Sequence, residues 1–410
     1  MTEICPKTEC TGCMACVNVC PTDCIRMQAD EHGALHPVID PQVCIDCMRC
    51  EKACPVNHPS VYRLPQHCYA AWVEDADFRR KSASGGVAAA LYRWWLAEEG
   101  GVAYGAVGTA DLGAELMRAD CLEALDVFRG SKYVASDAAR SYVQVRQDLK
   151  AGRKVLFVGL PCQVAGLLGA VGVMGAKARE QGQLLTCDLI CHGVSPKIYL
   201  QSEVSYLRRK HRLDRVDEVR FRGNDGNNFY FTLWREGKLI YRKPAAVNYY
   251  FSAYLNALSL RDNCYTCAYA RPERVSDLCL GDFIGLGKQQ PFEANPENVS
   301  MVSVQTEAGA RAWERFTAGG TARLGLRVVE RDYSEAVAGG VSLRAPFEKH
   351  PHTDRFRALY RMKGWYAASR RTLWEDVFVR KSFFHLILHK YALRLPRQYG
   401  QRWRQSFKKK

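Results

Sequence analysis

Cysteine is the residue type that dominates the chemistry of this sequence. The chain has 18 cysteines among 410 residues, and a motif of the form CxxCxxCxxxCP occurs twice near the N-terminus. A cubane 4Fe-4S cluster needs four converging thiolates, and three closely spaced cysteines on one loop supply three of them. The two copies of the motif therefore predict two cubane clusters within residues 1–60.

The fourth ligand of each cluster is predicted to come from the other copy, because the cysteine before the proline ligates the opposite cluster in two-cluster ferredoxins. One predicted ligand set is Cys10, Cys13, Cys16 and Cys54, and the other is Cys44, Cys47, Cys50 and Cys20. Zinc would use two CxxC pairs and would leave the third and fourth cysteine of each copy unexplained. The segment resembles bacterial two-cluster ferredoxins over its whole length, which implies electron transfer. Cys5 and Cys24 fall outside the pattern and are interpreted as small core residues.

Four further cysteines lie far apart in the sequence but in suggestive places. Cys162 and Cys191 each follow a predicted buried strand, and Cys264 and Cys267 form a CxxC in a turn-like stretch. Sites in open α/β sheets lie beyond the carboxyl ends of the strands. These four would hold one more metal centre, and spacing alone favours structural zinc as much as an iron–sulfur cluster.

The elements that must position these residues follow from the hydrophobic pattern. Strands are predicted at 102–107, 155–158, 184–190 and 301–305, and helices at 83–97, 141–149, from 163 to about 169, and at 307–316. Strands that alternate with helices argue for an α/β sheet. Residues 216–221, 229–234 and 238–242 are predicted to form an antiparallel insertion.

Several stretches resemble the coenzyme F-420 hydrogenase/dehydrogenase beta-subunit family. They are SASGGVAAAL, RGSKYVAS, VLFVGLPCQVAGL, DLICHGVSP, CYTCAYARPERVSDLCLGDFIGLG and VSMVSVQTEAG, in the order of the family and within about residues 67–330. The resemblance implies a flavoprotein with FAD and an additional 4Fe-4S cluster, whose ligands fall on Cys162, Cys191, Cys264 and Cys267. It also implies electron transfer between clusters and a flavin-bound substrate, which in several members is a deazaflavin coenzyme.

Two small-residue loops are candidates for holding the flavin. Residues 82–86 form a turn that opens a helix, and Ser84, Gly85 and Gly86 would offer backbone N–H groups to a diphosphate. The second loop contains Gly130, Ser131, Lys132 and Tyr133, where the lysine would neutralise phosphate or reduced flavin and the tyrosine would stack on a ring. A plain helix cap and a surface loop are the alternatives. No GxGxxG follows a strand and no Walker A motif occurs, which disfavours a dinucleotide or triphosphate site of those kinds.

Two more residues have candidate roles near these sites. His192 adjoins a predicted cluster ligand and would donate a hydrogen bond to sulfur or a proton near the flavin, or would simply cap a core edge. We take His192 and Lys132 as the candidate catalytic residues. Residues 222–228, RGNDGNN, depart from the FRxK pattern of the family, so the substrate stays open.

The positive charge of the chain is concentrated at its C-terminal end. Residues 355–410 carry 16 Lys/Arg against 2 Asp/Glu, whereas the preceding residues carry 42 basic and 41 acidic side chains. The body therefore shows no charge bias toward nucleic acid. The basic tail would lie on an anionic membrane surface, bind an acidic partner or RNA, or form a solvated helix. No apolar run is long enough for a membrane span and the N-terminus does not read as a secretory signal, so we expect a cytoplasmic protein, with peripheral contact at the inner membrane face as an option.

The sequence thus predicts an α/β (α+β) body at 67–354, a two-cluster ferredoxin-type domain at 1–60 and a basic helical tail at 355–410. The expected cofactors are three 4Fe-4S clusters and FAD. The leading hypothesis is an iron–sulfur flavoprotein oxidoreductase, fed by ferredoxin or a redox partner subunit, that acts on a small two-electron substrate such as a deazaflavin, with polysaccharide biosynthesis as one setting. The alternatives are a non-catalytic electron-transfer subunit of a larger complex and a structural zinc protein with a ferredoxin-like appendage.

Overall fold

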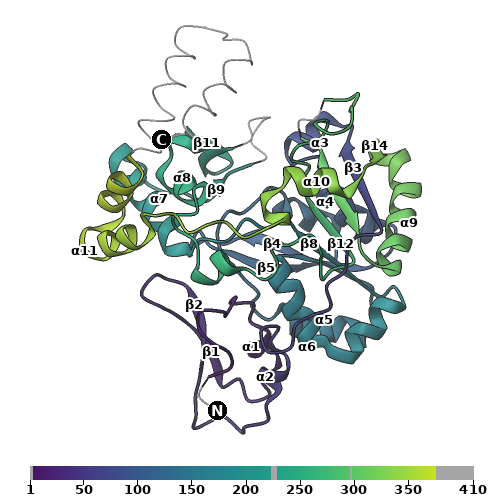
Figure 1. The fold of residues 1–410 in the computed structure, drawn as a ribbon, viewed down its shortest axis with the longest axis horizontal. Helices are drawn as coiled ribbons and strands as arrows, with labels where there is room; N and C mark the ends of the chain where they lie inside the picture. The colour runs from purple at the N-terminus through teal and green to yellow at the C-terminus, as the bar shows by residue number, and fades with distance from the viewer. Residues whose placement is uncertain (1–2, 223–228, 296–297, 375–410) are drawn as a thin grey trace.

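The computed structural model describes residues 3–222, 229–295 and 298–374. Figure 1 shows a small N-terminal domain in purple, a large body built on one sheet, and a group of helices around a second, smaller sheet. The expected α/β body with an N-terminal ferredoxin-type domain is confirmed. Most of the predicted basic tail, residues 375–410, lies outside the described residues.

The N-terminal domain is built from the two cysteine motifs and a hairpin between them. Helix α1 (Ala15–Val19) lies in the first motif and α2 (Arg49–Lys52) in the second. Strands β1 (Ile25–Ala29) and β2 (Leu35–Ile39) pair antiparallel between them. The residues before the two helices, Met14 and Met48, have left-handed φ angles of 65° and 58° at equivalent positions of the motif. The two loops therefore turn in the same way around their cysteines.

The body is organised around a nine-stranded mixed sheet. Its strand order is β14-β3-β13-β12-β8-β7-β4-β5-β6. The strands are β3 (His67–Val73), β4 (Val102–Gly108), β5 (Ala114–Ala119), β6 (Ser136–Asp137), β7 (Val155–Gly159), β8 (Leu184–Leu189), β12 (Leu278–Asp282), β13 (Ser300–Val304) and β14 (Leu326–Glu330). The central strands β4, β7, β8 and β12 are parallel to one another. The carboxyl ends of these strands consequently meet at one edge of the sheet.

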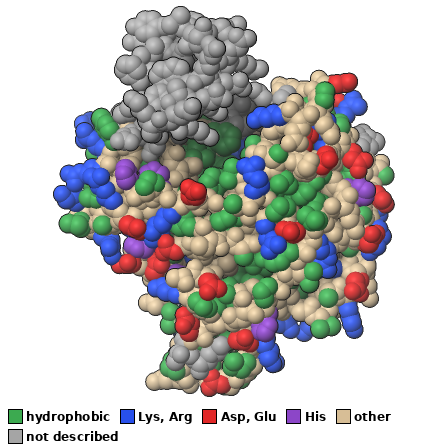
Figure 2. Space-filling view, viewed as in Figure 1, with side chains coloured by type: hydrophobic (Ala, Val, Ile, Leu, Met, Phe, Trp, Pro, Cys, Tyr) green, Lys and Arg blue, Asp and Glu red, His purple; other side chains and the backbone are tan. Residues whose placement is uncertain are grey.

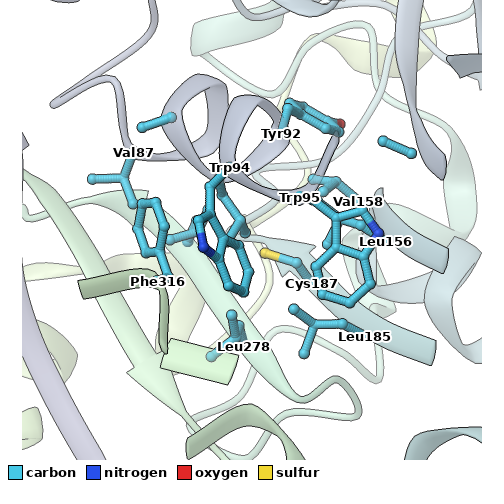
Figure 3. Close-up of a cluster of buried hydrophobic side chains, with 14 of the residues drawn as sticks. Val87, Tyr92, Trp94, Trp95, Leu156, Val158, Leu185, Cys187, Leu278 and Phe316 are labelled. Carbon is cyan, nitrogen blue, oxygen red and sulfur yellow. The ribbon is translucent and has the colours of Figure 1, made fainter. Parts of the chain in front are cut away.

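One face of the sheet is covered by α4 (Val87–Ala97) and α9 (Glu307–Leu324). Figure 3 shows Trp94 and Trp95 of α4 packed over Leu156 and Leu185 of β7 and β8, with Cys187 among them. These side chains are almost completely buried. Removing so much apolar surface from water is what holds the helix on the sheet, at roughly 25 cal/mol per Å².

The other face is covered by α5 (Ser141–Lys150) and α6 (Pro161–Glu180), and the N-terminal domain packs on these two helices (Figure 1). Glycines of α6 make the close approach possible. A Cβ added at Gly169 would lie 2.3 Å from the carbonyl oxygen of Ala53, and one added at Gly166 would lie 3.0 Å from Cys13 Sγ. The second and first cysteine motifs therefore both rest directly on α6.

A second core lies beside the main sheet. Strands β9 (Glu218–Arg220), β10 (Tyr230–Arg235) and β11 (Lys238–Pro244) form an antiparallel sheet, as the sequence predicts for an insertion. Helices α7 (Lys197–His211), α8 (Tyr249–Leu255) and α11 (Thr353–Thr372) pack with it around aromatic side chains. The two short helices α3 (Ala76–Arg80) and α10 (Tyr333–Gly339) complete the described helices of the body.

The surface carries charges of both signs. On the face shown in Figure 2, acidic and basic side chains are interspersed, and basic ones gather at the left edge over α7 and α11. Helix α7 ends in a basic run from Arg208 to His211. Among the described residues, no helix combines the length and the apolar character that a bilayer crossing needs.

Candidate iron–sulfur and flavin sites

Four cysteines from the two motifs surround a first small cavity in the N-terminal domain. They are Cys10, Cys13, Cys16 and Cys54, all of them buried. Three come from the first motif and one from the second, which is the grouping predicted for one cluster. The structure thus brings this set together around one space, and its role in ligation stays a prediction.

The remaining four motif cysteines surround a second small cavity. They are Cys20, Cys44, Cys47 and Cys50. Cys50 is buried, Cys20 and Cys44 are half-buried, and Cys47 is exposed. The second cavity therefore reaches the surface of the domain, whereas the first lies against the body.

Each cavity has a fifth cysteine beside it. Cys5 lines the first cavity, and Cys24 lines the second with its Sγ 3.4 Å from Cys20 Sγ. Contact with Cys10 and Cys54 raises the pKa of the Cys5 thiol. The sequence spacing does not indicate these contacts, because the chain folds Cys5 back onto cysteines of both motifs.

The four scattered cysteines of the body line the largest described cavity, of about 650 Å³. Cys162 lies in the first turn of α6, Cys191 follows β8, and Cys264 and Cys267 belong to the loop around a short 3-10 helix. Burial raises the pKa of the Cys191 thiol to about 12 and that of Cys264 to about 11. Buried thiols of this kind become thiolates when a cation takes the proton's place.

The described residues do not bring three or more Cys, His, Asp or Glu side chains together on a point where one metal ion would sit. The other body cysteines stay apart from the cavity. Cys187 and Cys279 are completely buried in the sheet, Cys68 is buried in β3, and Cys121 is exposed. These placements agree with the expectation that Cys187 faces the core.

A smaller cavity of about 230 Å³ lies beside the large one. Its lining includes Ser84, Gly130, Ser131, Lys132 and Tyr133, which are predicted flavin-binding residues. The two cavities share a wall formed by residues 191–194 together with Ser136, Leu160 and Gln163. A group in the small cavity is therefore a direct neighbour of the four body cysteines.

Gly85 and Gly86 do not line this cavity, which corrects the prediction that their N–H groups hold a diphosphate. The N–H of Gly85 donates to Ser300 Oγ at 3.0 Å, and that of Gly86 donates to the carbonyl of Ala83 at 3.1 Å. A Cβ at Gly85 would lie 2.4 Å from the carbonyl oxygen of Ala71. The small residues here allow the loop to approach β3 and β13 closely, which is the packing alternative to an anion cradle.

The ammonium of Lys132 is held by its own loop. Its Nζ donates to the carbonyls of Val127 and Arg129, each at 2.9 Å. Burial lowers the pKa of Lys132 to about 8. The ring of Tyr133 packs against Phe251 and Tyr254, with centroids 5.2 and 5.0 Å away. These contacts give the loop of residues 130–133 a fixed shape at the cavity.

His192 lies in the shared wall. Its Nδ1 is 2.8 Å from Ser342 Oγ, and its ring lies 5.6 Å from that of Phe347. Burial lowers the pKa of the imidazole, so the ring is neutral at pH 7. A neutral imidazole with one nitrogen fixed by a hydroxyl keeps a defined orientation between the two cavities.

Arg222 is a site residue that the sequence reasoning missed. It is 6% exposed, and its Nη1 donates to Asp282 Oδ2 at 2.6 Å. Burial alone would raise the pKa of the Asp282 carboxyl, but Arg222 holds it below its usual range. Arg222 lines the small cavity, and among the described residues its buried Nε has no hydrogen-bond partner. Its position at the start of RGNDGNN was the available signal; residues 223–228 lie outside the described residues.

Comparison with known protein families places the chain. Residues 152–325 match the family that describes the C terminus of the beta subunit of coenzyme F420 hydrogenase/dehydrogenase, and residues 9–58 match the 4Fe-4S dicluster domain. The chain belongs to this hydrogenase/dehydrogenase beta-subunit family and carries an N-terminal dicluster domain with two 4Fe-4S clusters. The resemblance inferred from the sequence is therefore confirmed.

The curated relatives match only the N-terminal region. "Ferredoxin 7Fe" from Hydrogenibacillus schlegelii is 39% identical over 70 residues, which is 16% of this chain and 81% of that protein. "Ferredoxin" from Alicyclobacillus acidocaldarius subsp. acidocaldarius is 48% identical over 42 residues, 10% of this chain and 47% of its own length. Ferredoxin-1 from Caulobacter vibrioides is 46% identical over 50 residues, 12% of this chain and 40% of its own length.

One solved structure shares the general arrangement of the chain. It is a chain of the F420-reducing [NiFe] hydrogenase complex from Methanosarcina barkeri, studied with xenon, at 21% identity. The match covers 78% of this chain and 94% of the other, with a TM-score of 0.43. We draw no argument about function from a likeness of this degree.

Proposed function

We propose that this chain is a flavin-dependent iron–sulfur oxidoreductase that passes electrons between a redox partner and a two-electron organic substrate. The observation that carries the proposal is the unbroken series of sites. The exposed second cavity, the buried first cavity, the four body cysteines and the small cavity follow one another through the molecule. Clusters carry one electron each, and a flavin converts between one- and two-electron transfers.

The partner is proposed to dock at the second cavity. Cys47 is exposed there, and neighbouring apolar side chains are also exposed, with Ile45 at 63% and Met48 at 41%. Ferredoxin or another redox partner would approach a cluster most closely at this point. The first cavity is closed off by α6, because Cys13 lies against Gly166.

The third site is proposed to hold a cluster on Cys162, Cys191, Cys264 and Cys267. The proposal is supported by the gathering of all four around one cavity and by their origin at the carboxyl ends of β7 and β8 and in the CxxC loop. Helix α6 links this site to the first cluster, since Cys162 and Gly166 are one turn apart on it. One helical turn rises only about 5.4 Å.

FAD is proposed to bind in the small cavity, and the chemistry of the residues fits an anionic, aromatic ligand. The unpartnered Nε of Arg222 would donate to an anionic oxygen, and Lys132 adds a second positive charge. At about 230 Å³ the cavity is smaller than most ligand sites, which span roughly 300–1,000 Å³. An FAD bound here would extend beyond it. His192 is proposed to hold a proton at the imidazole between this cavity and the cluster site.

The test uses the full chain purified without oxygen, reduced by dithionite and then mixed with candidate oxidants, including a deazaflavin. We expect reoxidation with transfer of two electrons per substrate molecule. Cys191→Ser should slow this reoxidation at least tenfold, and Cys121→Ser, at an exposed cysteine away from the cavities, should leave it unchanged. Reduction of the chain without reoxidation by any organic oxidant would instead favour a non-catalytic electron-transfer subunit. The basic tail's contact with a membrane stays a prediction.

A further inference from the structure

A buried arginine of the body reaches into the first cluster site. Arg261 immediately precedes the short helix that carries Cys264, and it is 5% exposed. Its Nη2 donates to the carbonyl of Cys10 at 3.1 Å, and both terminal nitrogens donate to the carbonyl of Leu35 at 3.1 Å. Its Nε donates to Asn263 Oδ1 at 3.1 Å. One side chain therefore ties a cluster loop and the β1–β2 hairpin to the loop of the third site.

The charge of Arg261 is not balanced by any carboxylate among the described residues. All of its hydrogen-bond acceptors there are neutral carbonyl or amide oxygens. A buried charge without a counter-charge is costly unless an anion lies close by. A cubane cluster on four thiolates is such an anion, and one-electron reduction adds a further negative charge. The electrostatics thus point from Arg261 to the cysteines beside it.

Gly12 provides the space for the guanidinium. It lies between Cys10 and Cys13, and a Cβ built on it would be 3.0 Å from Nη1 of Arg261. Its φ of +69° is also strained for any residue with a side chain. The guanidinium lies flat on the backbone of the cluster loop because this position carries no side chain.

Arg261 acts on cysteines of both sites. The pKa of the Cys10 thiol is lowered to about 4, chiefly by its contact with Cys5 and in smaller part by the charge of Arg261. Burial raises the pKa of Cys264 to about 11, and the charge of Arg261 opposes that rise. Both effects have the sign expected of a cation that favours negative charge at the two neighbouring sites.

We propose that Arg261 is the positioning residue that couples the first 4Fe-4S cluster to the body. Its guanidinium fixes the loop of Cys10 against the loop of Cys264, and its charge raises the reduction potential of the first cluster relative to the second. The part concerning the first cluster stands on the dicluster domain alone. The coupling to the third site rests on the proposed function.

The test is a redox titration of the full chain, followed by electron paramagnetic resonance of the two dicluster signals. In Arg261→Gln we expect one cluster to become harder to reduce by about tenfold in its equilibrium ratio, which is about 59 mV for one electron, while the other stays within twofold. Arg140→Gln is the matched control. It removes an exposed ion pair with Asp23 across the same domain boundary, and should move neither potential.

Two further variants separate charge from shape. Arg261→Lys keeps the charge but loses the forked contact, so the potential should return to within threefold of the parent while the magnetic interaction with a third cluster weakens. Gly12→Ala should shift the same cluster in the same direction as Arg261→Gln by displacing the guanidinium. Equal shifts of both clusters, no shift in Arg261→Gln, or a lysine variant as impaired as the glutamine variant would each overturn the proposal. If Arg261→Gln fails to load its first cluster, the lysine and Gly12 variants still decide. The shift of the first cluster is measurable without a third cluster or flavin, so its failure is distinct from failure of the proposed function.

Discussion

The docking of the N-terminal domain on the body depends on Gly169 of α6, and Gly169→Ala tests this directly. In an exposed helix interior, alanine is better than glycine by about 1 kcal/mol. Here the new Cβ would lie 2.3 Å from the backbone oxygen of Ala53, which precedes the proposed ligand Cys54. Overpacking costs about 1–3 kcal/mol, and contact with backbone at this distance belongs at the upper end of that range. The clash therefore outweighs the gain in helix propensity, and the net loss is about 1–2 kcal/mol, or roughly 5- to 30-fold in the docking equilibrium.

The assay is hydrogen–deuterium exchange of the anaerobically purified chain, read at α1, α2 and α6. We expect Gly169→Ala to exchange faster at all three helices, by roughly 5- to 30-fold, without loss of iron. Val173→Ala is the control on the same helix, because Val173 is 74% exposed. Slower exchange in Gly169→Ala, which is the usual result of replacing a helical glycine, would refute the reasoning about the close contact.

Two more predictions follow from buried charges. Arg222→Gln should weaken flavin binding by roughly 10- to 100-fold, since charge-assisted hydrogen bonds are worth about 1.5–3 kcal/mol, and Arg220→Gln, a paired surface arginine nearby, should not; fluorescence titration of apoprotein with FAD would contradict us if the two variants behaved alike. Burial raises the pKa of Glu203 to about 7, against the acceptance of hydrogen bonds from Asn248 and Trp365, so its folded form keeps a proton that the unfolded form has lost and stability falls as pH rises from about 4.5 to 7. Glu203→Gln should remove that slope and stabilise the chain by about 1–3 kcal/mol at pH 8; urea unfolding that kept the slope would reject this assignment.

The sequence predicts the parts of the fold that carry strong local patterns. The expected strand at 155–158 appears as β7, and the expected helix at 307–316 is the first half of α9. Strand β3 was not predicted, because HCYAAWV gains its strand character from pairing with β13 and β14, which lie more than 200 residues away. Strand pairing of this kind is set by tertiary contacts and not by local propensity.

The site shows the same division. Repeated spacing was enough to group the eight motif cysteines, since ligand spacing is a local property. The contacts of Arg261 with Cys10 and of Arg222 with Asp282 join residues 251 and 60 positions apart, and no local pattern announces them. The proposed diphosphate role of Gly85 and Gly86 failed because small residues serve close packing as readily as anion binding.

The central claim is that one chain holds three clusters and a flavin in series. The most direct measurement is iron, acid-labile sulfide and flavin on a single anaerobic preparation, with Cys191→Ser beside the parent chain. We predict about twelve iron and twelve sulfide with one FAD in the parent, and about eight iron with the dicluster signals intact in Cys191→Ser. About eight iron in both proteins, with zinc and no flavin, would contradict the account and make the body a scaffold for a ferredoxin.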